Sequence, residues 1–306
     1  MTTTTMMTTM TTTTMSDPGT VAFCVGTGRC GTTFITELLG LEPEVAASHE
    51  RLRLAACYHM FTKWHGIPHD AEGFLVDRDA VVASDLATHR ISFEASALLS
   101  HSVAELHARF DARFLLLVRR PDEVVSSFAV RGWFLEPIAW RDRSKPPTIP
   151  DGANPRHFFG RNLPRGDAEF ERWSKLTQLG KLGWFWAARN RAILAQLSAL
   201  PPARRSWLRL EDFDYAHYGE LAEFLGFRPT VDAARFAQLA ASRPNTGPNV
   251  PLTLDAWSEQ GAREFEAEVA PLAEAFGYEY RIEALRGGAA SIAGPARTLS
   301  DVLAGL

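Results

Sequence analysis

An apolar run, a glycine-rich turn and an amphipathic segment follow one another in residues 21–40. Residues 21–25 (VAFCV) are all apolar, which is typical of a parallel strand that is buried on both faces. Residues 26–31 contain three glycines, which let the backbone turn sharply and come close to a ligand. Residues 32–39 then carry apolar side chains at helical spacing. We therefore predict a strand, a loop and a helix in that order.

The glycine-rich loop (residues 26–31) leads into the amino end of the predicted helix. N–H groups in the first turn of a helix lack intrahelical acceptors, and together with the helix dipole they attract phosphate-like anions. The spacing Gly26-x-x-x-x-Gly31 is that of nucleotide triphosphatases, but Thr32 stands where that motif needs lysine. The positive charge lies inside the loop, at Arg29. The pattern predicts an anion-binding loop without the lysine of ATP-binding loops.

A second buried strand is predicted at residues 114–118 (FLLLV). It ends in Arg119-Arg120-Pro121, whereas a kinase or ATPase needs a carboxylate for magnesium, typically at the end of a later strand. Pro121 suits the first turn of a following helix. Arg119 at the strand end and Ser127 two turns into that helix are able to hold one phosphate from two sides. These residues indicate a ready-made anionic cofactor bound without a metal.

The loop and the arginine-to-serine unit together resemble the PAPS-dependent sulfotransferase family. The resemblance implies that the loop holds the 5′-phosphosulfate of PAPS (3′-phosphoadenosine 5′-phosphosulfate) and that the later unit holds its 3′-phosphate. Arginine in the loop is closer to the carbohydrate and tyrosylprotein branches than to the cytosolic aryl branch, where lysine is common. The residues assigned to the donor by this resemblance are Gly28, Arg29, Cys30, Gly31, Thr32, Thr33, Arg119 and Ser127.

Shorter motifs extend the resemblance over most of the chain. Residues 131–134 (RGWF) resemble a stretch of bacterial members, and residues 206–213 (SWLRLEDF) resemble a late strand followed by an R-x-E-D-(L/F) turn. Residues 221–226 (LAEFLG) look like a family helix that ends in F-L-G. Trp257 and residues 276–278 (FGY) lie where relatives carry a tryptophan and a G-Y ending. The order and spacing of these pieces support the resemblance.

A sulfotransferase needs a base that takes the proton of the acceptor as the sulfuryl group is attacked in line. Glu50 lies 21 positions after Arg29, the distance at which the tyrosylprotein branch has its catalytic glutamate. The neighbouring His49 is an alternative base, because the cytosolic branch uses histidine. Glu94 matches a glutamate of bacterial relatives. Four roles are open for it: to orient the acceptor, to act as base, to cap a helix or to form a salt bridge. The catalytic candidates are Glu50, Arg29, His49 and Glu94.

Four residues that lie close together in the sequence are of types that bind metal ions. A His-x-x-x-His spacing binds zinc when it lies on one helix. Gly66 and Pro68 interrupt such a helix, so we predict no metal site and expect these histidines to face solvent or an acceptor pocket. The four residues are Cys57, His59, His65 and His69.

Strand-like and helix-like segments alternate through the rest of the chain. Residues 80–83 are predicted as a short strand, residues 96–110 as a helix and residues 175–200 as a long helix. Helices that alternate with parallel strands favour a three-layer α/β/α fold around a central parallel sheet, with ligands at the carboxyl ends of the strands. The resemblance implies the P-loop-like sulfotransferase version of this fold.

The two ends of the chain and one internal segment depart from this pattern. Residues 1–18 are mostly threonine and methionine, lack the regions of a signal peptide, and are predicted to be a disordered tail. Residues 19–284 form the predicted sulfotransferase domain. Within it, the proline-rich residues 136–166 are predicted to be an acceptor-site loop. Residues 285–306 are predicted to be a linker followed by a short terminal helix.

Composition narrows the class of protein. The 306 residues are 46% hydrophobic and 22% charged, which suffices for one well-filled α/β domain. The net charge of −4 argues against a general nucleic-acid binder, since such proteins concentrate basic charge. Three cysteines do not make a disulfide framework, and no segment is apolar for the length of a membrane span. We expect a cytoplasmic enzyme with a small-molecule partner and no membrane or nucleic-acid partner.

The predicted function is transfer of a sulfuryl group from PAPS to a hydroxyl, phenol or amine of a small-molecule or carbohydrate-like acceptor. PAP (3′-phosphoadenosine 5′-phosphate) is then the product, a carboxylate is the base and no metal takes part. Two alternatives stay open: a P-loop kinase that transfers phosphate from ATP, and a nucleotide-binding module without catalysis. The acceptor and the oligomeric state are not predicted.

Overall fold

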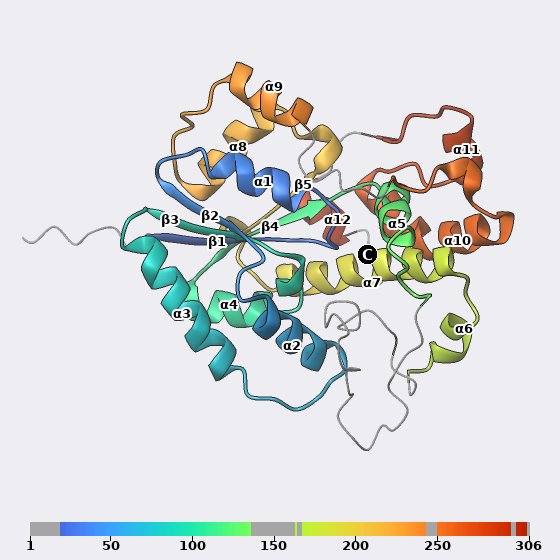
Figure 1. Ribbon diagram of the computed structural model, residues 1–306, viewed down its shortest axis with the longest axis horizontal. Coiled ribbons are helices and arrows are strands. Elements are labelled where there is room, and N and C mark those ends of the chain that lie inside the picture. The colour runs from blue at the N-terminus through green and yellow to red at the C-terminus, as the bar shows by residue number, and fades with distance from the viewer. Residues whose placement is uncertain (1–18, 136–162, 164–166, 243–249, 295–297, 305–306) are drawn as a thin grey trace, which may run out of the picture.

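Parallel strands form the centre of the molecule, and helices cover both of their faces (Figure 1). The computed structural model describes residues 19–135, 163, 167–242, 250–294 and 298–304. Within these residues the sheet has five strands in the order β2-β3-β1-β4-β5. The strands are β1 (Thr20–Val25), β2 (Val45–His49), β3 (Ile91–Ala95), β4 (Arg113–Val118) and β5 (Arg205–Arg209). The predicted strands at residues 21–25 and 114–118 are confirmed as β1 and β4.

Alternating side chains of β1 enter two separate cores. Val21, Phe23 and Val25 pack into the core on one face of the sheet. Ala22 and Cys24 pack into the core on the other face. Strand β4 divides its residues between the same two cores in the same way. An uninterrupted apolar run is therefore stable here because water reaches neither face of the central strands.

The helices lie in two layers, one on each face of the sheet (Figure 1). This confirms the three-layer α/β/α prediction. One layer contains α1 (Thr32–Leu39), α8 (Tyr215–Leu225) and α9 (Ala233–Ser242). The opposite layer contains α2 (Arg53–Trp64), α3 (Glu72–Leu86), α4 (Val103–Phe110) and α7 (Gln178–Ser198). On this side, α5 (Pro121–Ala129) and α10 (Glu259–Phe276) pack against α7. Short helices complete the described chain: η1 (Ala97–Leu99), α6 (Phe170–Ser174), η3 (Pro202–Arg204), η4 (Leu210–Asp212), η5 (Leu254–Ala256), α11 (Ile282–Arg286) and α12 (Leu299–Ala304).

The strand predicted at residues 80–83 is wrong, since these residues lie inside α3. Phe74, Arg78 and Val82 are the buried side chains of this helix, and their spacing of four is that of one helical face. The apolar run at residues 80–83 is too short to separate a strand from a helix.

The predicted helices are confirmed with one adjustment. The helix expected at residues 96–110 is divided into η1 and α4. The helix expected at residues 175–200 is α7, and the short terminal helix expected within residues 285–306 is α12. The expected domain boundary after residue 284 falls inside α11, and Val302 of α12 is buried in the same core as β1.

The connections place the loops after β1 and β4 next to each other. The chain runs from β1 to β2 towards one edge of the sheet, and from β3 it crosses β1 to reach β4 on the other side. In such doubly wound sheets the carboxyl ends of the strands at the reversal point border a ligand-binding crevice. Both predicted donor-binding segments follow the carboxyl ends of strands at this reversal point.

The predicted tail at residues 1–18 and the predicted acceptor-site loop at residues 136–166 lie outside the described residues, apart from residue 163. In the part of the chain that is described, none of the helices combines the length and the apolar character needed to cross a membrane.

Candidate functional site

The glycine-rich loop (residues 26–31) packs against the ends of two other segments. A Cβ atom on Gly26 would lie 2.6 Å from the backbone oxygen of Leu117 in β4. Gly31 has φ 99° and is the N-cap of α1, and a Cβ there would lie 2.6 Å from Leu210. Other residues are therefore excluded by contact at Gly26, and by contact and conformation at Gly31. Gly28 also has positive φ, at 81°.

Cys30, Thr32 and Thr33 lie beside the amino end of α1. The N-cap position makes no side-chain hydrogen bond to the helix. The Thr32 hydroxyl instead forms a 2.9 Å hydrogen bond with Nε2 of His49, at the end of β2. Thr33 is half-buried in the same turn. The Cys30 side chain is fully buried, which raises the pKa of its thiol to about 11, so Cys30 offers a ligand only its backbone.

Arg29 and Ser127, 98 positions apart in the chain, are joined directly. Nε of Arg29 donates a 2.9 Å hydrogen bond to Oγ of Ser127 in α5. Arg119, which follows β4, donates from Nη1 to the backbone oxygen of Arg29 at 3.1 Å. Arg29 has φ 57°, a left-handed conformation that is uncommon outside glycine. The structure thus brings the two predicted halves of the donor site into contact.

A third arginine, Arg131, lies close to these two. We call Arg29, Arg119 and Arg131 the arginine cluster. The pKa of Arg29 is lowered chiefly by burial and then by the positive charges of Arg131 and Arg119. Nε of Arg131 is buried without a hydrogen-bond partner. Like charges held together at a buried position are unfavourable, and a bound anion would relieve their repulsion.

Arg131 was not among the predicted site residues, although it belongs to the RGWF stretch. It lies four positions after Ser127 and just past the end of α5. The RGWF stretch itself was the usable signal, because it places an arginine directly after the helix that carries Ser127.

Neighbouring residues hold the loop after β4 in place. Arg119 pairs with Glu123 one turn into α5. The backbone oxygen of Arg119 accepts a 3.1 Å hydrogen bond from Nε1 of Trp186. Burial lowers the pKa of Arg119, while Glu211 opposes this shift. Arg120 pairs with the buried Asp122 at 2.7 Å. Arg119 thus contacts both α5 and the glycine-rich loop, whereas the Arg120 side chain pairs with acids at the start of α5.

Glu50 follows β2 in a left-handed conformation, with φ 49°. Its N–H donates to the backbone oxygen of Ala95 at 3.1 Å, and its Oε2 lies 3.4 Å from Nε of Arg53. The Glu50 charge raises the pKa values of both Arg29 and His49, so the carboxylate lies within electrostatic reach of the arginine cluster. Burial is the larger effect on His49 and lowers its pKa. Of the two candidate bases, His49 is engaged with Thr32, and Glu50 is the carboxylate near Arg29.

Glu94 lies in β3, and only 4% of it is exposed. Its carboxylate pairs with the guanidinium of Arg78 and accepts a 3.0 Å hydrogen bond from the N–H of Arg51. Burial raises the pKa of Glu94, while Arg78 and Arg51 pull it down. Among the roles considered for Glu94, this geometry favours the salt bridge.

The histidines weighed as metal ligands pack mainly against aromatic rings. His59 stacks on Phe74 with ring centroids 4.1 Å apart, and the centroid of His69 lies 4.9 Å from that of His59. His65 caps the end of α2 and lies beside Phe61. Across the described ranges, no three His, Cys, Asp or Glu side chains are grouped so as to hold a metal ion.

Aromatic rings border the glycine-rich loop on the α5 side. Phe128 and Trp133 stack with centroids 4.0 Å apart, and Phe185 lies edge-on to Trp133 at 5.3 Å. A Cβ on Gly28 would lie 3.5 Å from the Phe128 ring. Phe128 and Phe185 are buried in the core, and Trp133 packs against it, so these rings pack the loop against the core.

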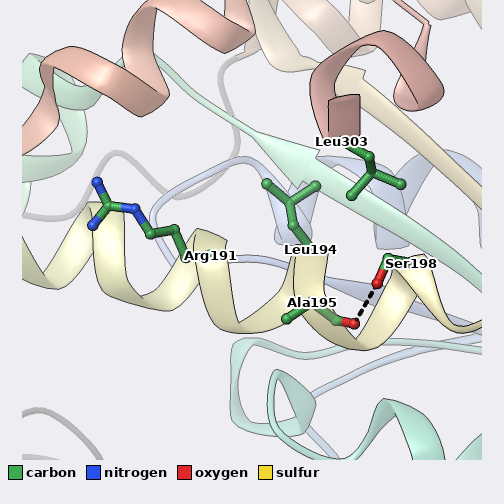
Figure 2. A pocket seen from close by; sticks show the side chains of 5 residues that line it. All are labelled: Arg191, Leu194, Ala195, Ser198 and Leu303. Atoms are coloured by element: carbon green, nitrogen blue, oxygen red, sulfur yellow. Dashed lines mark hydrogen bonds between the residues drawn. The ribbon is translucent and has the colours of Figure 1, made fainter. Parts of the chain in front are cut away.

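A separate cavity of about 310 Å³ lies between α7 and α12 (Figure 2). Ser198 donates a 2.7 Å hydrogen bond to the backbone oxygen of Ala195 at its edge. None of the predicted site residues lines this cavity. Its lining consists of Arg191, Leu194, Ala195, Ser198 and Leu303.

Comparison with known proteins finds similarity only among solved structures. No protein-family model matches the sequence, and no curated protein matches it. A sulfotransferase domain from the curacin biosynthetic pathway is 15% identical, with a TM-score of 0.39 over 83% of this chain and 98% of that one. The sulfotransferase domain of the Synechococcus PCC 7002 olefin synthase is 14% identical, with a TM-score of 0.39 over 82% of this chain and 94% of that one. Sulfotransferase STF9 from Mycobacterium avium is 13% identical, with a TM-score of 0.47 over 87% and 79% of the two chains.

Proposed function

We propose that the protein is a sulfotransferase that moves the sulfuryl group of PAPS to a hydroxyl, phenol or amine of a small-molecule or carbohydrate-like acceptor. The observation that carries this proposal is the arginine cluster at the amino end of α1. Arg29 is bonded to Ser127, and Arg119 to the backbone of Arg29. Such a concentration of positive charge suits a ligand with phosphate groups at two positions.

The donor would be divided between the two joined segments. The first-turn N–H groups of α1, with Arg29, Thr32 and Thr33, would bind the 5′-phosphosulfate, as helix starts bind phosphate. Arg119 and Ser127 would bind the 3′-phosphate by charge-assisted hydrogen bonds. Arg131 would add a third positive charge to this phosphate site. Gly28, Cys30 and Gly31 would contribute backbone and space rather than side chains.

Sulfuryl transfer at this site would need one base and one group that stabilises charge. The acceptor oxygen or nitrogen attacks sulfur as the bond from sulfur to the phosphate oxygen of PAPS breaks, and PAP leaves. Glu50 would take the acceptor proton. Arg29 and the α1 N–H groups would stabilise the negative charge that grows on the departing phosphate and the sulfuryl oxygens. His49 would hold the Thr32 hydroxyl through their 2.9 Å hydrogen bond.

Side chains at the strand ends favour this function over a P-loop kinase. A kinase needs a lysine after the loop and an acid that holds magnesium. Thr32 stands at the first position, and Arg119 follows β4 at a strand end where such an acid commonly stands. The fold itself does not separate the two functions, because a parallel sheet presents its ligands at the same edge in either case.

Ligand binding tests the proposal directly. We expect PAP to raise the melting temperature of the protein and ATP with magnesium or ADP to raise it less. Arg119→Ala should weaken PAP binding about 10- to 100-fold, the value of a hydrogen bond between charged groups. Arg235→Ala, at an exposed position of α9, is the matched control and should bind PAP normally. Stabilisation by ATP with magnesium but not by PAP would contradict the proposal.

Transfer is tested by incubating the protein with radiolabelled PAPS and a panel of phenols, sugars and amines. We expect label to move to at least one class of acceptor. Tight PAP binding without transfer to any acceptor, by a protein that is otherwise stable, would favour the nucleotide-binding module without catalysis.

A further inference from the structure

A buried ion pair lies behind the segment that carries Glu50. Arg78 projects from α3 and Glu94 from β3, and their side chains are 1% and 5% exposed. Such a pair is weak grounds for stability, because desolvation of two charges offsets much of their attraction. An apolar pair of the same size would hold the fold about as well. Stability alone therefore does not explain why both positions carry a charge.

Both partners of the pair grip the backbone of the same residue, Arg51. Oε1 of Glu94 accepts the N–H of Arg51 at 3.0 Å. Nη2 of Arg78 donates to the backbone oxygen of Arg51 at 3.0 Å. The Arg51 side chain is held as well, by two hydrogen bonds of 2.9 and 2.8 Å to Asp85 at the end of α3. The pair thus holds the N–H of the peptide unit before Arg51 and the carbonyl oxygen of the peptide unit after it.

Arg51 lies between two residues in an unfavourable backbone conformation. Glu50 has φ 49° and Leu52 has φ 47°, and neither is glycine. Left-handed residues of this kind persist only when the surrounding structure holds them. The N–H of Glu50 is also bonded to Ala95, the residue after Glu94. The direction in which the Glu50 side chain leaves the backbone is therefore set by contacts to β3 and α3.

We propose that the Arg78–Glu94 pair is a positioning device for Glu50, an inference that rests on the proposed function in which Glu50 is the base. The contacts of the pair run to the backbone of Arg51. It acts through Arg51, whose clamped backbone fixes the place of Glu50 within electrostatic reach of Arg29. In this role Glu94 is a positioning residue rather than a base.

The test removes the clamp without leaving a buried charge. Arg78→Met combined with Glu94→Leu replaces both charges by apolar groups, so the fold should be retained. We expect kcat to fall about 100-fold, the cost of a displacement of about 1 Å in a catalytic group. The affinity for PAP, measured by calorimetry, should stay within about twofold, because the donor site keeps all its residues. The kcat of Arg78→Lys should lie between those of the unaltered protein and the double variant, since an ammonium keeps the charge but not the two-armed geometry of the guanidinium.

Two controls separate positioning from general disturbance. Asp79→Asn changes the next residue of α3, whose partner is the surface residue Arg109, and should leave kcat unchanged. In a Glu50→Gln background, the double substitution should cause little further loss of kcat, because the positioned group is already inactive.

Three results would overturn the positioning role. They are an unchanged kcat in the Arg78→Met/Glu94→Leu variant, an equal loss of kcat in the Glu50→Gln background, or a fall in PAP affinity as large as the fall in kcat. Failure of the unaltered protein to bind PAP would instead overturn the proposed function, and this role with it. The calorimetric measurement on the unaltered protein therefore distinguishes the two failures.

Discussion

Arg29 and Glu50, the proposed charged centre and the proposed base, share an unusual backbone conformation. Their φ angles are 57° and 49°. Such strain is found mainly where neighbouring contacts hold it and where a side chain must point in one direction. Arg29 is held through Ser127 and Arg119, and Glu50 through Ala95 and the clamped Arg51. At both residues, an unfavourable backbone conformation thus sets the direction of a charged side chain.

Glu50→Gln tests the proposed base. The amide keeps the size of the side chain but does not accept a proton, so kcat should fall by about 10²- to 10⁴-fold. PAP affinity should remain within a few-fold, because the donor is held by other residues. Radiometric transfer and calorimetry measure the two quantities. Turnover at the normal rate would move the role of base to His49.

His59 makes stability depend on pH. It is 2% exposed, and burial lowers its pKa from about 6.5 to about 4. Between these values the unfolded chain binds the proton and the folded protein does not, so stability is lost as pH falls from 6.5 towards 4. The loss due to His59 should be about 2 kcal/mol between pH 7 and pH 5. His101, whose pKa is lowered by burial to about 2, adds to the same trend.

Urea unfolding at the two pH values measures this effect. His59→Phe keeps a ring against Phe74 but has no proton to bind. The variant should therefore lose about 2 kcal/mol less stability than the unaltered protein on going from pH 7 to pH 5. Equal losses would show that His59 does not stay neutral in the fold.

Two glycines of the unit formed by β1, the glycine-rich loop and α1 pack closely against neighbouring segments. Gly26 lies against the backbone of β4, and Gly31 lies against Leu210, which follows β5. A loop fixed at both ends by neighbouring strands needs little reorganisation when an anion binds, which favours affinity. The geometry of this element therefore depends on the adjacent strands as much as on its own residues.

Gly26→Ala tests this dependence. Its Cβ would lie 2.6 Å from a backbone oxygen and 2.7 Å from Sγ of Cys30, and a backbone contact cannot be relieved by rotating a side chain. The loop should move, and PAP affinity should fall at least about tenfold through the misplaced anion ligands. Gly66→Ala is the control: φ is also positive, at 61°, but nothing lies within 4 Å of the added atom. Equal effects of the two substitutions on PAP affinity would contradict this account.

Arg209 joins distant parts of the whole molecule. It is 2% exposed at the end of β5, and one guanidinium nitrogen donates to the backbone oxygens of Phe276, Gly277 and Gly294. Two residues later, Glu211 accepts from the Tyr278 hydroxyl at 2.7 Å and from the N–H of Arg120 at 2.9 Å. The R-x-E-D turn thus ties the segment after α10 to the sheet and to the loop that carries Arg119.

Arg209→Met should lower the free energy of unfolding by about 3–5 kcal/mol, because it leaves Asp212 and several buried oxygens without their donor. Urea unfolding measures the change. Arg235→Met, at an exposed position, should change it by less than about 0.5 kcal/mol. A small effect at Arg209 would mean that the segment after α10 docks without it.

Sequence patterns predicted β1 and β4 but not β2 and β3. The first two are apolar after their first residue, whereas β2 (VAASH) and β3 (ISFEA) carry polar residues inside the sheet. Ser92 and Glu94 are buried there because Asp85, Arg78 and Arg51 supply their hydrogen bonds. Since those partners come from other segments, no local pattern marks these strands as buried.

The sequence by itself determined the strand, loop and helix around Arg29 and the arginine after β4, because backbone conformation there depends on residues only a few positions apart. The tertiary structure decided which charges meet. It joined Arg29 to Ser127, brought Arg131 beside them and buried Arg78 against Glu94. The physical reason is that desolvation and Coulomb energy depend on distance in space, so a buried charge is stable only where the fold brings its partner.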